Sequence, residues 1–359
     1  MEDKKRGLGP DYGLLSRCRG ELMGLAMLWI MAYHAFFWSP AWPWFRDFKD
    51  QGFCGVDVFL LLSALGVSLS LTRRQESYGS YLKRRLVRVL PLYFLVSGLY
   101  ALALRLAGRI DLKTAAWTVS TLFYWLNKPH CFNWYIPALV GFYLIAPPAV
   151  RLLRRVRWPG AVVAAAWVGC FILYHIREAA GPSELNGGTV MRLPVFFLGL
   201  LLGVFLARGE RLTVWQGALW LALPCLIPVA RRALRPYYLP TGFAFCLVCV
   251  PLCLAVAWLL ERLPTAGLRW LLRKIGESSL EIYLLNVVFV REYGLLAPLF
   301  STPEVQYAVT VPANILLGMV LHYLLKKPMA WLTAKVTGSA SPSRPPKGEG
   351  YSAEDRSGR

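Results

Sequence analysis

Between Val56 and Leu71 the chain reads VDVFLLLSALGVSLSL, an apolar run whose single ionisable side chain is that of Asp57. A helix that crosses a bilayer needs about 20 mostly apolar residues, with a workable range of roughly 17–25. This run is close to that length, and similar runs recur along the chain. The pattern predicts an all-α, polytopic integral membrane protein.

The composition agrees with a membrane protein. Hydrophobic residues make up 56% of the chain and charged residues only 17%, whereas about a quarter of the residues of soluble proteins are charged. The formal net charge of +20 would suggest nucleic-acid binding in a soluble protein. Here the basic residues form short clusters between the apolar runs, which is typical of loops that set membrane topology. We therefore expect no nucleic acid among the partners.

The apolar runs predict about ten spans. They are Leu22–Trp38, Val56–Leu71, Val89–Ala107, Trp134–Val150, Gly160–Tyr174, Leu193–Ala207, Val214–Val229, Phe243–Leu260, Leu280–Leu299 and Val305–Leu325. An eleventh run, Thr114–Leu126, is short and carries Thr and Ser. Cytoplasmic loops are enriched in Lys and Arg, and ten spans with a cytoplasmic N-terminus put 28 of the 40 basic residues inside. An eleventh span would turn the four arginines between 151 and 157 outward, so the charges favour ten spans with both termini cytoplasmic.

The chain divides into a basic cytoplasmic leader, 1–20, a membrane domain, 21–327, and a cytoplasmic tail, 328–359. From about residue 338 the tail is rich in Ser, Pro, Gly and charge. Such a composition buries too little apolar surface to fold, so we expect disorder there.

Two ionisable residues lie within the predicted spans at similar depth. His34 is about 18 Å from the inner face, at about 1.5 Å per residue, and Asp57 begins the second span from the outer side. Each costs about 2.5–3.5 kcal/mol to insert, which makes both functional candidates. A carboxylate beside an imidazole raises its basicity, as is needed to take a proton from an attacking hydroxyl. The alternative is a structural hydrogen bond between helices.

Other polar residues carry weaker signals. Cys246, Cys249 and Cys253 have a helical spacing, but no His lies near them in the sequence, so we expect core residues and no metal site. His322 lies near the cytoplasmic end of the last span, where we expect a structural or snorkelling role.

A cluster of arginines, Arg84, Arg85 and Arg88, leads into the third span from the inner side. Most such clusters set topology or contact lipid headgroups. Guanidinium groups can also bind phosphates in a bidentate manner. The sequence pattern leaves both interpretations open.

Six segments together resemble the membrane acyltransferase family 3. They are Arg19–His34, Gly52–Ser63, Tyr81–Tyr93, Trp134–Pro137 with the following Tyr143 and Pro147, Arg192–Gly199 and Gly276–Asn286. The resemblance covers about residues 17–327 in the order of the family, and the ten spans of the family agree with the charge count.

The resemblance implies a multi-pass enzyme of the bacterial cell membrane. Such enzymes move an acyl group, commonly acetyl from acetyl-CoA, onto a hydroxyl of a surface polysaccharide or another envelope glycan. It implies that His34 is the general base and Asp57 its partner. It also implies four donor-binding residues, namely Arg19, Arg84, Arg85 and Arg88. The further pocket candidates are Glu21, Ser63, Trp134, Tyr135, Arg192, Glu281, Tyr283 and Asn286. The expected partners are acyl-CoA as co-substrate, an envelope glycan or lipid-linked sugar as acceptor, and membrane lipids, with no tightly bound cofactor.

The chain departs from the family pattern in places. Met23 stands where many members have an arginine, and a subgroup in which Arg19 or Glu21 takes over is one explanation. Asn286 stands where many members have His, and Lys326 where Glu is common. Two other functions compete with the enzyme: a multi-pass transporter, and a catalytically degenerate relative that binds acyl-CoA. The absence of an inverted repeat and of paired broken helices in the sequence speaks against the transporter.

Overall fold

The computed structural model describes residues 12–35, 38–74, 76–126, 131–179, 184–210, 241–262 and 264–338. These residues form helices and no strand. The helices of the first half are α1 Gly13–Arg17, α2 Arg19–His34, α3 Pro43–Asp50, α4 Gly55–Arg73, α5 Tyr78–Leu106, α6 Leu112–Val119 and α7 Leu122–Trp125. Those of the second half are α8 Tyr135–Arg155, α9 Pro159–Ala179, α10 Glu184–Ala207, α12 Thr241–Arg262, α13 Ala266–Glu277, α14 Ser279–Arg291, α15 Tyr293–Leu296 and α16 Pro303–Thr337. Short 3-10 helices, Gly52–Cys54 and Ala297–Leu299, precede α4 and follow α15.

Within the described residues, seven helical segments are long and apolar enough to cross a membrane. They are 43–73, which joins α3 to α4, then α5, α8, α9, the part 188–207 of α10, α12 and α16. The bent pair of α14 with residues 293–299 makes an eighth. The all-α polytopic class is therefore confirmed. The count of ten and the cytoplasmic termini stay predictions, because α2 has only 16 residues and the predicted span Val214–Val229 lies outside the described residues.

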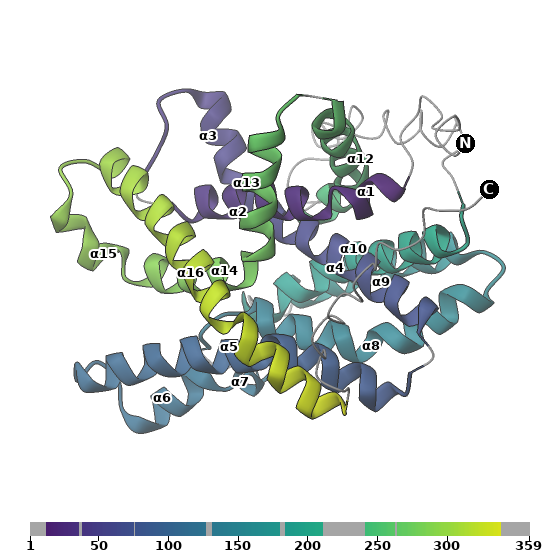
Figure 1. Ribbon diagram of the computed structural model, residues 1–359, viewed down its shortest axis with the longest axis horizontal. Coiled ribbons are helices and arrows are strands. Elements are labelled where there is room, and N and C mark those ends of the chain that lie inside the picture. Colours follow the sequence, from purple (N-terminus) through teal and green to yellow (C-terminus); the bar gives the residue numbers. More distant parts are fainter. Residues whose placement is uncertain are drawn as a thin grey trace, which may run out of the picture.

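Two predicted segments are not single straight helices. The run 114–126 forms α6 and α7, of eight and four residues, with a break at Ser120. Neither is long enough to cross a bilayer, and α6 packs beside α5 (Figure 1). The predicted span Leu280–Leu299 bends by 68° after α14. Glu292, at the bend, accepts hydrogen bonds from Tyr100 at 2.7 Å and Arg109 at 2.8 Å, which draws the chain toward the end of α5.

The last helix, α16, runs past residue 327, where the predicted membrane domain ends. Its 35 residues are about 52 Å long at 1.5 Å per residue, longer than the roughly 30 Å hydrocarbon core of a bilayer. Gly338 ends the helix with a φ of +66°, a conformation that glycine adopts without strain. The tail that we expect to be disordered lies outside the described residues.

The centre of the bundle is α4, whose residues Leu60, Leu61 and Leu62 are fully buried. The helix α10 packs along it, whereas few residues of α9 and α16 are buried. Small residues let the backbones of α4 and α10 approach closely. A Cβ atom on Gly199 would lie 2.4 Å from the Leu61 carbonyl oxygen, and one on Gly203 would lie 2.8 Å from that of Leu65.

This close approach predicts that Gly199→Ala destabilises the protein. The added methyl group meets backbone atoms that cannot move without shifting α4, so we expect a loss of about 1–3 kcal/mol. The measurement is thermal unfolding of the detergent-solubilised protein. Gly98→Ala in α5 is the matched control, because nothing lies within 4 Å of the added Cβ. Equal unfolding temperatures for the two variants would contradict the packing described here.

Candidate active site

A cavity of about 640 Å³ opens between α2, α4, α5, α8, α14 and α16. At one end it is lined by Lys326, Met329 and Thr333 of α16, and at the other it reaches Ile30 of α2 and Val56 of α4. Under the predicted topology, the first end faces the cytoplasm. Ile30 lies one helical turn before His34. The cavity therefore leads from the inner side of the bundle to the neighbourhood of His34.

The four predicted donor-binding arginines line this cavity together. Arg84 is paired with Glu76 and also donates to the Ser70 hydroxyl. In the described part of the chain, Arg19, Arg85 and Arg88 have no carboxylate partner within salt-bridge distance. The Nε atoms of Arg19 and Arg85 are buried there without a hydrogen-bond partner. The guanidinium groups of the cluster therefore repel one another, and a bound anion would offset this repulsion.

The position of Arg19 bears on the loss of the family arginine at residue 23. Arg19 and Met23 are one turn apart on α2, and both line the cavity. The Arg19 side chain passes Gly66 of α4, where a Cβ atom would lie 3.2 Å from its Nη1. Arg19 therefore reaches the cavity from a neighbouring turn of the same helix, as it must if it takes over the role of the family arginine. Glu21, the alternative candidate for that role, does not line the cavity.

Glu21 faces the opposite side of α2. Its carboxylate is fully buried and accepts hydrogen bonds from Arg273 at 2.7 Å and Arg269 at 3.4 Å, both on α13. Its contacts link two helices, and it lines neither of the two cavities described in this subsection.

Asp57 does not pair with His34 in the described structure. Its carboxylate is 1% exposed, and Oδ1 lies 3.6 Å from Nε of Arg192 on α10. The Arg192 guanidinium also donates to the Gly188 and Phe53 carbonyl oxygens and stacks over Trp134 at 4.7 Å. A buried carboxylate needs a nearby cation, and Arg192 supplies it. The sequence places His34 and Asp57 at a similar depth, but depth along a helix does not fix the side to which a residue points.

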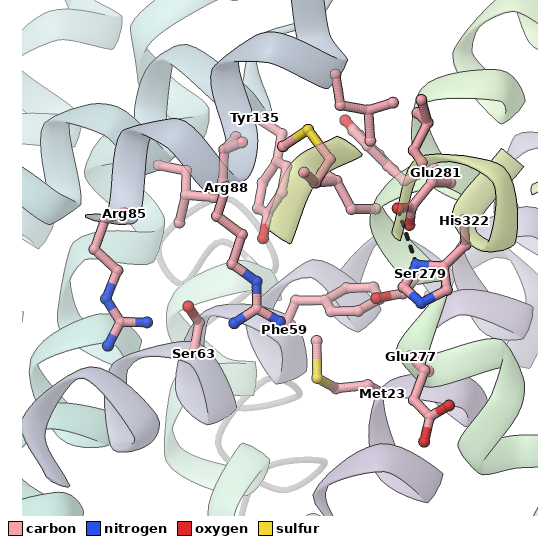
Figure 2. Close-up of a pocket in the computed structure, with 18 of the residues that line it drawn as sticks. Met23, Phe59, Ser63, Arg85, Arg88, Tyr135, Glu277, Ser279, Glu281 and His322 are labelled. Carbon is pink, nitrogen blue, oxygen red and sulfur yellow. Dashed lines mark hydrogen bonds and ion pairs between the residues drawn. The ribbon is translucent and has the colours of Figure 1, made fainter. Parts of the chain in front are cut away.

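The remaining pocket candidates divide between two cavities. Ser63, Tyr135, Glu281 and Tyr283 line the large one (Figure 2). Asn286 lies with His34 in a smaller cavity of about 30 Å³. Trp134 and Arg192 line neither cavity; Arg192 pairs with Asp57 and stacks over Trp134. His34 is also the last residue of α2, which ends four residues before the predicted Trp38.

His322, for which we expected a structural or snorkelling role, faces the large cavity. His322 lies in its wall, and its Nδ1 is 3.0 Å from Oε1 of Glu281 (Figure 2). The signal was available, because Glu281 and His322 are both ionisable residues inside neighbouring spans. The cost of inserting a charged residue marks this pair as it marks His34 and Asp57.

Residues 22–325 match the family model Acyl_transf_3, described as an acyltransferase domain. The chain belongs to this acyltransferase family. The match covers nearly the same range as the resemblance carried by the six segments, so the family is confirmed, and the protein is a membrane acyltransferase. Neither the curated proteins nor the solved structures contain a significant match to this acyltransferase.

The ion pair predicts that Asp57 acts on stability. Asp57→Ala leaves Arg192 buried without its counter-charge, so we expect a loss of about 3–5 kcal/mol in thermal unfolding. The double variant Asp57→Leu with Arg192→Met should recover part of this loss. Glu261→Ala is the control, because it breaks the exposed pair with Arg17, for which about 0–1 kcal/mol is expected. Normal stability of Asp57→Ala with loss of acyl transfer would instead favour a catalytic role.

Proposed function

We propose that this protein is an O-acyltransferase that takes an acyl group from acyl-CoA and passes it to a hydroxyl on the outer side of the membrane. The acceptor is an envelope glycan or a lipid-linked sugar, the acyl group is acetyl, and the site is the bacterial cell membrane. The observation that carries the proposal is the cluster of Arg19, Arg85 and Arg88 in a cavity that leads to within one turn of His34.

The charge of the cavity suits the donor. A cluster of guanidinium groups without carboxylate partners binds phosphates strongly, because planar guanidinium groups match phosphate oxygens. Acyl-CoA carries phosphates at one end and the thioester at the end of a long flexible arm. Phosphates at the arginines and an arm along the cavity would direct the thioester toward Ile30 and His34. The cavity volume lies within the range of about 300–1,000 Å³ typical of ligand sites.

The proposed reaction balances with one base. His34 takes the proton of the acceptor hydroxyl, and the oxygen attacks the thioester carbonyl carbon. The carbon–sulfur bond breaks, the carbon–oxygen ester bond remains, and the CoA thiolate leaves and takes up a proton. Donor entry from the cytoplasm and an acceptor near His34 would let an acyl group cross the membrane without its carrier.

His34→Ala should abolish this reaction. General acid–base catalysis contributes about 10²–10⁴-fold, so we expect a rate loss in this range. The measurement uses membranes with radiolabelled acetyl-CoA and follows both thiol release and label in the glycan fraction. His175→Gln is the control, since His175 lies on α9 and lines neither cavity. A near-normal rate for His34→Ala would overturn the mechanism, and movement of an unmodified solute by the wild type would favour the transporter.

Arg85→Gln and Arg88→Gln should each weaken donor binding. A hydrogen bond to a charged group is worth about 1.5–3 kcal/mol, so the KM for acetyl-CoA should rise roughly 10–100-fold. Arg105→Gln, at the far end of the same helix, is the matched control. An unchanged KM for both cavity variants would remove the main support for an acyl-CoA site. Binding of acetyl-CoA without transfer by the wild type would favour the degenerate relative.

A further inference from the structure

Three polar side chains from three helices meet in the small cavity around His34. Nδ2 of Asn286, on α14, lies 2.8 Å from Nδ1 of His34. Nδ2 of Asn314, on α16, lies 3.3 Å from Oδ1 of Asn286. The two asparagines are 5% and 1% exposed. They form a continuous chain of amides that ends on the imidazole ring.

The amide that meets Nδ1 decides which ring nitrogen carries the proton. An amide nitrogen only donates hydrogen bonds, so Nδ1 must accept when Asn286 presents Nδ2 to it. The proton of neutral His34 then sits on Nε2. In that arrangement Nε2 donates and has no lone pair with which to take a proton from a hydroxyl. The arrangement in the structure is therefore not that of a general base.

Proton abstraction requires the opposite tautomer, with the proton on Nδ1 and the lone pair on Nε2. A half-turn of the Asn286 amide places Oδ1 against Nδ1–H and moves no backbone atom. Asn286 Nδ2 then faces Asn314, whose amide must turn as well to present its oxygen. The Oδ1 atom of Asn314 has no hydrogen-bond partner among the described residues, so its turn gives up no bond at that atom. Both arrangements keep the hydrogen bond between His34 and Asn286 and the one between Asn286 and Asn314.

We propose that Asn286 and Asn314 are positioning residues that switch the proton on His34 between Nε2 and Nδ1. With Asn286 Oδ1 against Nδ1–H, the proton of the acceptor hydroxyl moves to Nε2. The imidazolium then donates from Nδ1 to Asn286 and returns the Nε2 proton to the leaving thiolate. This role rests on the proposed function, because it assigns to His34 the base of that reaction. Asn314 matters only through the orientation of Asn286.

The pair of His322 and Glu281 offers an internal comparison. An ionised carboxylate only accepts hydrogen bonds, so Glu281 fixes one tautomer of neutral His322 and cannot switch. Asn286→Asp would give His34 the same kind of partner. A purely structural role for the asparagines is the competing explanation, since buried hydrogen bonds between membrane helices contribute about 0.6 kcal/mol each.

The experiment compares acidic and apolar replacements at both positions. Asn286→Asp holds the proton on Nδ1 and should keep at least about a third of the wild-type kcat. Asn286→Leu removes the acceptor and should lower kcat roughly 10–100-fold, the range seen when a partner that orients a histidine is lost. Asn314→Asp should keep activity, since its carboxylate accepts from Asn286 Nδ2, and Asn314→Leu should lower kcat less than Asn286→Leu does. Loss of activity in a folded Asn286→Asp variant, or a normal kcat for Asn286→Leu, would overturn the proposal.

A second readout does not depend on activity. The chain has four histidines, so ¹⁵N-histidine NMR of the full-length protein in nanodiscs, assigned with His34→Gln, reports each tautomer. At about pH 8, above the usual histidine pKa of about 6.5, we expect Nε2–H in the wild type and Nδ1–H in Asn286→Asp. Ser97→Ala, which removes a buried hydroxyl bonded within α5, should change nothing. Identical tautomers in the wild type and Asn286→Asp would refute the switch even if acyl transfer were absent, whereas absence of transfer alone would refute the proposed function.

Discussion

The buried ion pair between Asp57 and Arg192 holds the centre of this bundle together. Asp57 lies at the start of α4 and Arg192 within α10, and the backbones of these two helices also approach closely through Gly199 and Gly203. A carboxylate and a guanidinium without water can remain ionised only while they face each other. The pair therefore fixes the relative rotation of α4 and α10. Of the helices that line the large cavity, α2 and α8 pack against this unit.

The same constraint makes unpaired charge informative inside a membrane. In the described residues, Glu21 is bonded to Arg273, Arg84 to Glu76 and Glu292 to Arg109. The pairs of Glu21 and Glu292 link distant segments of the chain, whereas Glu76 and Arg84 lie close together in sequence, and none of these pairs needs a ligand. The arginines 19, 85 and 88 break the pattern, since they share a cavity and no carboxylate lies within reach of them there. The presence or absence of a carboxylate partner thus distinguishes charges that stabilise the bundle from charges that are available to bind an anion.

Much of the fold could be predicted from the sequence because hydrophobic run length is a one-dimensional signal. The predicted spans Val56–Leu71 and Phe243–Leu260 match α4 and α12 within two residues at each end, whereas α5 begins 11 residues before the predicted Val89. The bend after α14 was missed, because Leu280–Leu299 is apolar enough to be interpreted as one span. The hydrogen bonds that Glu292 accepts from Tyr100 and Arg109 are tertiary contacts, which the sequence pattern does not record. The site was predicted less evenly. Arg84, Arg85 and Arg88 line the large cavity, but their role in donor binding stays a prediction. The expected partner of Asp57 was His34, whereas the structure places it beside Arg192, because helix rotation depends on packing that the sequence pattern does not record.

The buried residues of α16 are Gln306, Asn314 and Gly318, and His322 and Lys326 continue the same series at intervals of four. The rest of this long helix is mostly exposed. Evolution can therefore exchange most of its residues as long as they stay apolar. Insertion or deletion of one residue is a different matter, since it would rotate everything beyond it by about 100°. Such a change near residue 312 would separate Gln306 from the other four, and so α16 should vary freely in composition but not in length.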